Sequence, residues 1–264
     1  MTLTPLLTDD APAPFILHPA TCDAPFIFVC DHAGKRIPER LGDLGLSAAD
    51  RTRHIAWDIG IAGVARRLHA ALGAPLIEQV YSRLVIDCNR APGHDSSIPS
   101  HSDQTIISGN QNLSDDERRQ REREIFRPYH NCIAQQLATI DPQKCAMISL
   151  HSFTPFWQGQ ERAWDAGVLF HKDAVSAEIM HQVLVESGRW VVGKNEPYRM
   201  TATSDYTIPY HAETRGMPYL EIEIRQDLIA DEAGQENWAA ILTQLLPIYW
   251  RRWTACAPMH RAYA

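Results

Sequence analysis

Short apolar runs and amphipathic segments follow one another along this chain. The apolar runs, bounded by turn-prone residues, predict strands at 26–30, 74–80, 83–87, 146–150, 167–170 and 219–225. Helical spacing and capping residues predict helices at 47–53, 58–72, 114–140, 173–188 and 236–254. Strands that alternate with helices indicate an α/β fold, a three-layer αβα sandwich around a mostly parallel or mixed sheet. Because no repeat or low-complexity linker interrupts it, residues 1–264 are predicted to form one domain.

Local signals set the ends of the predicted helices. Gly73 stands where a glycine would close the first long helix. The sequence from Ser114 to Glu117 is a capping box, which predicts the start of a long charged helix. Pro128 lies inside that helix and predicts a kink, because proline lacks the backbone N–H that a helix uses. Asp173 is a typical N-cap for the helix that follows it.

Composition and charge exclude several classes of protein. The formal net charge of −7 argues against non-specific binding to nucleic acid or to an anionic membrane, since binding to either needs a basic surface. No apolar run approaches the length of about 18 residues that a membrane span needs. The first residues, MTLTPLLTDDAPAPF, do not form a signal peptide, and the six cysteines follow no CxxC spacing. We therefore expect a cytoplasmic protein with reduced thiols that acts on a small molecule.

Three predicted strands end in ionisable side chains. His32 follows the strand 26–30, His151 follows the strand 146–150, and Glu221 and Glu223 lie on the strand 219–225. In α/β sheets, ligands bind at the carboxyl ends of the strands. The sequence therefore predicts that these side chains share one site.

The two histidines suggest a metal centre. Zinc in a hydrolase takes three nitrogen or oxygen ligands from the protein and keeps one open position. His32 and His151 would be two of these ligands, and Asp58 is the best third, because it begins a predicted helix and could point back over the sheet edge. Glu39 and His54 are rivals for that place, and a plain helix N-cap is the alternative for Asp58. We expect one zinc ion.

The glutamate pair allows two interpretations. Glu221 and Glu223 lie two residues apart on a strand, so their side chains project from one face, with Arg225 beside them. Such a pair is unfavourable inside a protein unless it faces water, a cation or a metal. One interpretation is a solvated edge strand. The other is a general base that takes a proton from a water activated by the metal and passes it to the leaving amine.

The segment RLVIDCNR holds the candidate substrate-binding groups. Alternation along a strand would place Arg83, Asp87 and Asn89 on one face, and Arg90 would start a loop. Guanidinium groups bind carboxylates in pairs of hydrogen bonds, so Arg83 and Arg90 are candidates for holding a carboxylate substrate. Arg83 is also a candidate catalytic residue. The alternative is that Arg83 and Asp87 simply pair with each other.

As a set, these motifs resemble the N-formylglutamate amidohydrolase (deformylase) family. The resemblance covers residues from about 26 to 227 through DHAG, HIAWDIG, YSRLVIDCNR, LHSFTP, GKNEPY and LEIEIRQD. It implies the fold of the zinc-dependent exopeptidases. By resemblance to those enzymes, Asn89 and Arg90 would bind the substrate carboxylate, and His151, followed by Ser152, would bind zinc. Glu223, in a Glu-x-Arg sequence, would be the general base.

One departure from the exopeptidase pattern bears on the metal site. Carboxypeptidases use His-x-x-Glu, whereas the third residue after His32 is Lys35. More distant zinc amidases of cell-wall turnover place the acid well downstream, at a helix start, which favours Asp58 over Glu39. Ser152 is not in a G-x-S-x-G turn, so it is counted with Asn89, Arg90 and Arg225 as a candidate substrate-binding residue and not as a nucleophile.

The resemblance implies an amidohydrolase of histidine degradation that releases formate from N-formyl-L-glutamate. A zinc carboxypeptidase or a cell-wall amidase of the same fold is the alternative within the enzymes. A non-catalytic protein that binds acidic amino acids is the alternative outside them. Metal content would separate the last class, because a binding protein needs no stoichiometric zinc.

Overall fold

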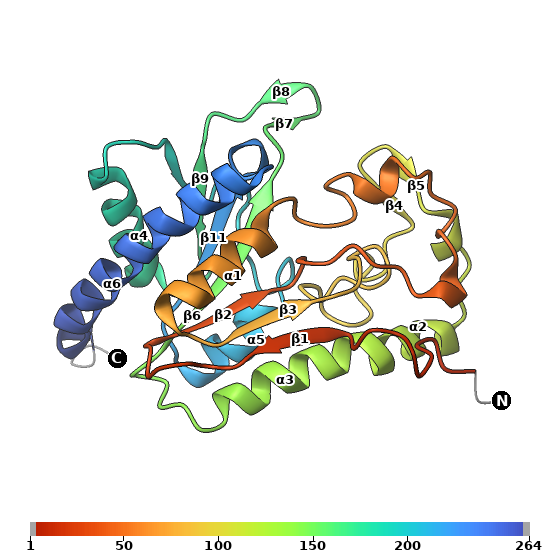
Figure 1. The fold of residues 1–264 in the computed structure, drawn as a ribbon, viewed down its shortest axis with the longest axis horizontal. Helices are drawn as coiled ribbons and strands as arrows, with labels where there is room; N and C mark the ends of the chain where they lie inside the picture. The colour runs from red at the N-terminus through yellow and green to blue at the C-terminus, as the bar shows by residue number, and fades with distance from the viewer. Residues whose placement is uncertain (1–3, 261–264) are drawn as a thin grey trace.

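A computed structural model describes residues 4–260 of the chain and shows one central sheet between helical layers (Figure 1). Within these residues the sheet has seven strands in the order β1-β3-β2-β6-β11-β9-β10. The strands are β1 (Phe15–His18), β2 (Phe26–Cys30), β3 (Leu76–Gln79), β6 (Ala146–Phe153), β9 (Ala166–Leu169), β10 (Val192–Lys194) and β11 (Tyr219–Arg225). Only the β1–β3 and β9–β11 pairs are antiparallel, so the predicted three-layer fold with a mostly parallel sheet is confirmed.

The helices cover both faces of the sheet. The α-helices are α1 (Ile61–Leu72), α2 (Asp115–Arg121), α3 (Arg127–Leu137), α4 (Ala174–Glu186), α5 (Thr207–His211) and α6 (Glu232–His260). Helices α1, α4 and α6 pack on one face, and α3 and α5 pack on the other (Figure 1). No helix in residues 4–260 has the length and apolar character that a membrane crossing requires.

The two faces follow from the alternation of side chains along each strand. In β2, Phe26 and Phe28 belong to the core beneath α1 and α6, whereas Ile27 and Val29 belong to the core beneath α3. In β11, the apolar residues Leu220, Ile222 and Ile224 all belong to the core beneath α1 and α6. The two glutamates between them therefore face the α3 side, together with the odd-numbered residues of β6.

Short elements complete the fold. Two hairpins stand apart from the sheet, β4 (His101–Ser102) with β5 (Thr105–Ile106) and β7 (Phe156–Trp157) with β8 (Gln160–Glu161). Single 3₁₀ turns are η1 (Glu39–Leu41), η2 (Asp50–Thr52), η3 (Ser108–Asn110), η5 (Glu213–Arg215) and η6 (Gln226–Leu228). The β7–β8 turn has positive φ at both Gln158 and Gly159, as a tight hairpin of this kind requires.

Several predicted elements differ from the structure. The segment 83–87 is not a strand, because Val85 donates its N–H to the Ser82 carbonyl and closes a turn. The helix predicted at 47–53 is only the 3₁₀ turn η2, and the closing helix α6 is longer than predicted. The helix predicted at 114–140 is interrupted just before Pro128, where a π-helical stretch, η4 (Glu122–Phe126), joins α2 to α3, while the kink itself stays a prediction. β1, β10 and both hairpins were not predicted.

Candidate metal centre and active site

A cavity of about 640 Å³ opens at the carboxyl ends of the central strands. His32 follows β2, His151 and Ser152 belong to β6, and Glu221 and Glu223 belong to β11, and all five residues line the cavity. β2 pairs with β6, and β6 pairs with β11. The chain thus brings together the strand-end residues that the sequence predicts to share a site.

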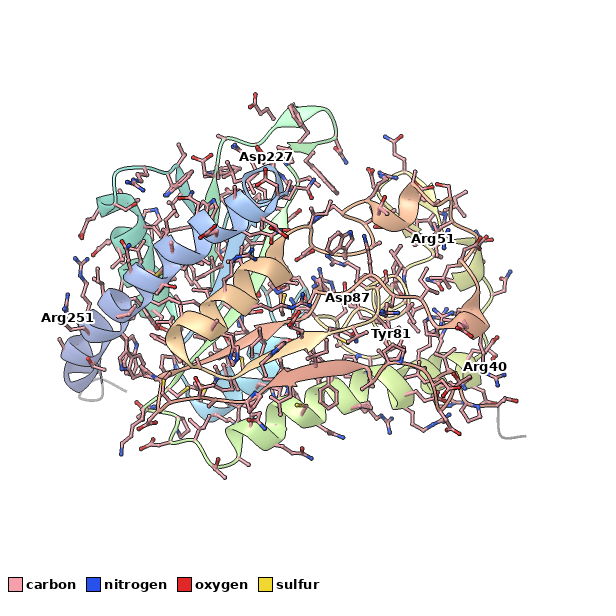
Figure 2. All side chains as sticks on the ribbon, viewed as in Figure 1. Arg40, Arg51, Tyr81, Asp87, Asp227 and Arg251 are labelled. Atoms are coloured by element: carbon pink, nitrogen blue, oxygen red, sulfur yellow. The ribbon has the colours of Figure 1, made fainter. Side chains whose placement is uncertain are left out.

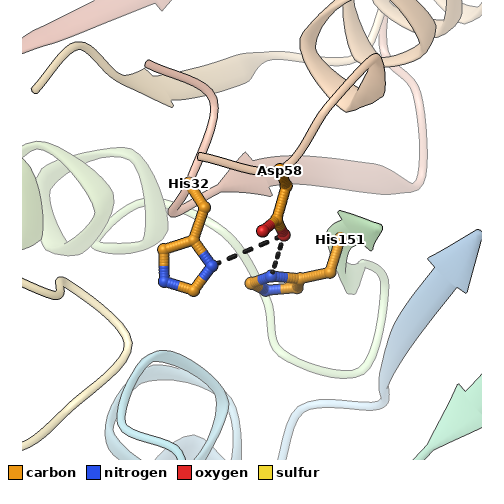
Figure 3. A group of neighbouring side chains, drawn as sticks. All are labelled: His32, Asp58 and His151. Atoms are coloured by element: carbon orange, nitrogen blue, oxygen red, sulfur yellow. Dashed lines mark hydrogen bonds and ion pairs between the residues drawn. The ribbon is translucent and has the colours of Figure 1, made fainter. Parts of the chain in front are cut away.

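His32, Asp58 and His151 form a compact group that could hold a metal ion. One potential ligand atom from each lies within 4.8 Å of the others, and all three residues are buried. The Nδ1 atoms of the two imidazoles lie 3.5 Å and 3.0 Å from the same Asp58 oxygen, Oδ2 (Figure 3). His32 Nδ1 is buried without a hydrogen-bond partner in the described part of the chain. Two imidazoles and a carboxylate are a donor set that fits zinc.

A polar side chain contacts the opposite nitrogen of each imidazole. His32 Nε2 lies 2.8 Å from Asp87 Oδ1, whereas His151 Nε2 lies 3.0 Å from the Ser149 hydroxyl and 3.5 Å from Asp31 Oδ2. Metal-binding histidines usually have such a partner, which fixes the ring and its tautomer. Asp31 is a residue that the sequence analysis missed, although it stands next to His32 in the DHAG motif. Tyr129 donates its hydroxyl to Asp31 Oδ1 and keeps the carboxylate in place.

Backbone contacts explain why Asp58 reaches the site. Its N–H donates to the His32 carbonyl, and Gly60, not Asp58, is the N-cap of α1, so the N-cap alternative is wrong. Of the rivals, Glu39 belongs to η1 and does not line the cavity. His54 lines the cavity and lies 3.8 Å from Asp58, and burial lowers its pKa to about 4.

The DHAG loop fits tightly against the next strand. A Cβ atom on Gly34 would lie 2.0 Å from the Val80 carbonyl oxygen, so the backbone can approach β3 this closely only at a glycine. The contact holds the loop that carries His32 against the end of the sheet.

Glu221 and Glu223 lie in the middle of the sheet. β11 runs between β6 and β9, and the two residues are only 3% and 5% exposed, so the solvated edge-strand interpretation is wrong. Glu223 stands opposite His151 in the register of β6 and β11. The Oε2 atoms of both glutamates lack a hydrogen-bond partner within residues 4–260. Burial raises the pKa of Glu221 well above its usual range and that of Glu223 to about 7.

Arg83 lines the cavity, but its guanidinium already has partners. Nε and Nη2 donate to Asp87 Oδ2 at 3.1 Å and 2.8 Å, and Nη1 lies 3.5 Å from Asp58 Oδ1. The pairing of Arg83 with Asp87 is confirmed. The two side chains meet because a turn brings them together, and not because they alternate along a strand. Arg83 therefore holds a fixed positive charge next to the group formed by His32, Asp58 and His151.

Asn89 and Arg90 also line the cavity. Asn89 Oδ1 accepts the N–H groups of Tyr206 and Thr207 at the start of α5, and its Nδ2 donates to Asp205. Arg90 Nη1 donates to the Ser204 carbonyl and lies 3.6 Å from Asp205 Oδ1. The Nε and Nη2 atoms of Arg90 have no hydrogen-bond partner among the described residues. Asn89 is therefore chiefly a support for the chain segment that Arg90 contacts.

Ser152 and Arg225 lie differently with respect to the cavity. Ser152 lines it, donates its N–H to Asp58 Oδ2 and its hydroxyl to the Ile59 carbonyl, and so holds the Asp58 carboxylate in place. Arg225 is not among the lining residues, because it pairs with Asp165 at 3.1 Å and Asp227 at 2.8 Å. Figure 2 shows Asp227 near the start of α6, well apart from Asp87 in the interior. The substrate-binding role predicted for Arg225 stays a prediction.

Comparison with known proteins decides the family. The family model described as N-formylglutamate amidohydrolase matches residues 24–230, which is most of the chain. The chain belongs to the N-formylglutamate amidohydrolase family. Membership indicates an enzyme that hydrolyses amide bonds. Among curated proteins, none matches the chain in sequence.

Two solved structures are similar to this chain in fold. A gene product of Agrobacterium tumefaciens is 33% identical, with a TM-score of 0.88 over 94% of this chain and 98% of the other. An N-formylglutamate amidohydrolase of Ralstonia eutropha is 20% identical, with a TM-score of 0.69 over 91% of this chain and 99% of the other. The second likeness supports the fold alone.

Proposed function

We propose that the protein is a zinc-dependent amidohydrolase that cleaves N-formyl-L-glutamate into formate and L-glutamate. The observation that carries this proposal is the convergence of two imidazole Nδ1 atoms on one oxygen of Asp58, with Glu223 opposite His151. His32, Asp58 and His151 would hold one ion. When bound, such an ion supplies Lewis-acid chemistry, because it polarises a carbonyl group and lowers the pKa of a water.

Glu223 would move the proton of the reaction. The attacking water forms a C–O bond with the formyl carbon and gives one proton to the Glu223 carboxylate. The C–N bond then breaks, and the protonated Glu223 gives that proton to the amino nitrogen of the leaving glutamate. Glu223 Oε2 can take and return a proton in this way, because no hydrogen bond within the described residues fixes one protonation state of this buried oxygen.

The two cavity arginines would have different roles. Arg83 would stabilise the negative charge that develops on the formyl oxygen, since Asp87 fixes its guanidinium beside Asp58. Arg90 would bind a carboxylate of the substrate through its Nε and Nη2 atoms. Asn89 would support the start of α5, and Ser152 would keep Asp58 in position.

Metal analysis with a substrate screen tests the proposal. The purified protein should contain about one zinc ion per chain and release formate from N-formyl-L-glutamate. A chelator should abolish this activity and zinc should restore it. Full activity after complete metal removal would refute the metal-dependent mechanism. Hydrolysis of peptides, but of no N-acyl amino acid, would instead support the carboxypeptidase alternative.

A further inference from the structure

Arg162 is a nearly buried arginine beside the cavity. It follows the β7–β8 hairpin, its N–H donates to the Pro155 carbonyl, and the residue is only 8% exposed. Three aromatic rings surround the guanidinium. Its Cζ atom lies 5.6 Å from the ring centroid of Phe153, 5.4 Å from that of Trp157 and 4.6 Å from that of Tyr198. Figure 1 shows the hairpin beyond the carboxyl end of β6.

Only one nitrogen of this guanidinium is used. Nη1 donates to the carbonyl oxygen and the Oγ1 of Thr154 at 3.2 Å and 3.3 Å and to the Tyr198 hydroxyl at 2.9 Å. Nε and Nη2 have no hydrogen-bond partner in the described part of the chain, and no described carboxylate lies within 4.0 Å of Arg162. Arg83 and Arg225 differ, because both already pair with carboxylates.

The position of this charge links it to the active site. Thr154, which holds Nη1, is three residues beyond His151. Arg162 itself is not among the residues that line the cavity, but Trp157 and Tyr198, which pack against its guanidinium, both line it. A purely structural role, in which Arg162 pins the hairpin to Tyr198, accounts for Nη1 and the aromatic contacts. It leaves the Nε–Nη2 edge without a role, although this edge is the one that binds a carboxylate with two parallel hydrogen bonds.

We propose that Arg162 binds a carboxylate of the substrate, as a second site beside that of Arg90. The substrate class is then an N-acyl amino acid with an acidic side chain, whose two carboxylates need two separate guanidinium groups. This inference rests on the proposed function, which it deepens. The surroundings favour the role, because a guanidinium that is 8% exposed and packs against three aromatic rings is partly desolvated, which strengthens its attraction for a carboxylate.

A comparison of one and two carboxylates tests the role of Arg162. Binding of glutarate and of butyrate to the zinc-loaded enzyme would be measured by calorimetry for wild type, Arg162→Gln, Arg162→Lys and the control Arg252→Gln. Arg252 is a partly exposed arginine on α6 that pairs with Glu186 and does not line the cavity, so its replacement removes one charge away from the site. Arg162→Gln should weaken glutarate binding by about 10- to 100-fold, because a charge-assisted pair is lost, and should leave butyrate binding within about 3-fold. The control should bind both ligands as wild type does.

Hydrolysis gives an independent measurement. The kcat/KM for N-formyl-L-glutamate should fall in Arg162→Gln, whereas that for N-formyl-L-glutamine should stay nearly unchanged. Equal losses for the two substrates, or equal losses for glutarate and butyrate, would show a structural role and overturn the inference. If Arg162→Gln does not fold, Arg162→Lys carries the same test, because lysine keeps the charge but not the two parallel donors. If wild type hydrolyses no N-acyl amino acid, the proposed function fails, while glutarate binding still decides the role of Arg162.

Discussion

Replacement of Glu223 tests the proposed chemistry most directly. The side chain is buried, stands opposite His151, and has an Oε2 without a hydrogen-bond partner in the described residues. Glu223→Gln keeps the shape of the side chain but removes the group that carries the proton. We expect kcat to fall by a factor of about 10² to 10⁴, the usual worth of general acid–base catalysis. This range corresponds to about 3 to 5 kcal/mol in the activation free energy.

Glu221 cannot take over the role of Glu223. It stands opposite Ser149 in the register, two residues or about 7 Å further from the carboxyl end of β11. Burial also raises its pKa well above the usual range, which favours its protonated form. We therefore expect the loss in Glu223→Gln to lie toward the upper part of the range.

The pH dependence has a defined sign. The active form of Glu223 is the carboxylate, and burial raises the pKa of this group to about 7. Activity should therefore rise with pH as Glu223 loses its proton and fall as pH is lowered. A bound cation favours the carboxylate, so the midpoint in the zinc enzyme should lie below that value. Glu223→Gln should lose this acidic limb of the profile.

The assay is formate release from N-formyl-L-glutamate, measured together with zinc content and the unfolding midpoint. Glu223→Gln should keep its zinc and its fold. The matched variant is Glu221→Gln, which changes the same group on the same strand and should weaken metal affinity or stability more than kcat. A zinc-loaded Glu223→Gln enzyme that works at the wild-type rate would leave the mechanism without its base.

Three further predictions follow from the site and the core. His151→Ala should lose the metal but keep the fold, and elemental analysis that finds full zinc occupancy in this variant would show the ligand assignment to be wrong. Arg90→Ala should raise KM for N-formyl-L-glutamate by the equivalent of roughly 2 kcal/mol, because a charge-assisted pair is lost, and an unchanged KM would remove Arg90 from the binding site. Burial lowers the pKa of His130 to about 4 and that of His211 to about 3, whereas a histidine in the unfolded chain has a pKa of about 6.5. At pH values below 6.5 the unfolded chain therefore binds more protons than the folded chain does. The free energy of unfolding should then fall by about 1.4 kcal/mol per pH unit for each histidine as pH drops from 6.5 toward 4, and the slope, measured by urea unfolding, should be smaller in His211→Gln.

The fold could be predicted where the residues of one segment are enough to indicate its secondary structure. Phe26–Cys30 and Tyr219–Arg225 are buried strands in the structure as in the sequence, because an apolar run bounded by turns marks a central strand. The segment 83–87 shows the limit of that signal. It is apolar enough for a strand, but Ser82 accepts the N–H of Val85, and Asp87 accepts the N–H of Asn89. Local hydrogen bonds of this kind replace sheet pairing, and the apolar pattern does not reveal them.

The site could be predicted best where strand ends supply it. His32 and His151 converge because the parallel strands β2 and β6 bring their carboxyl ends to one edge, and Asp58 joins them from the segment before α1. Arg162 was missed, because an arginine in a polar hairpin normally belongs to a solvated surface. Its burial depends on Tyr198, which is far from it in sequence and meets it only in the folded chain.

The distribution of unsatisfied groups argues that function, and not stability, determines the residues of this site. Five buried carboxyl groups surround the two imidazoles: Asp31, Asp58, Asp87, Glu221 and Glu223. Every buried carboxylate oxygen that lacks a hydrogen-bond partner in the described residues belongs to this cluster, on Asp31, Glu221 or Glu223. Apolar residues of similar volume would often stabilise the fold as well or better. The excess of carboxyl groups is explained if a cation completes the site, because a divalent ion held by two imidazoles and Asp58 would offset the burial and the like-charge repulsion that raise the pKa of the glutamates.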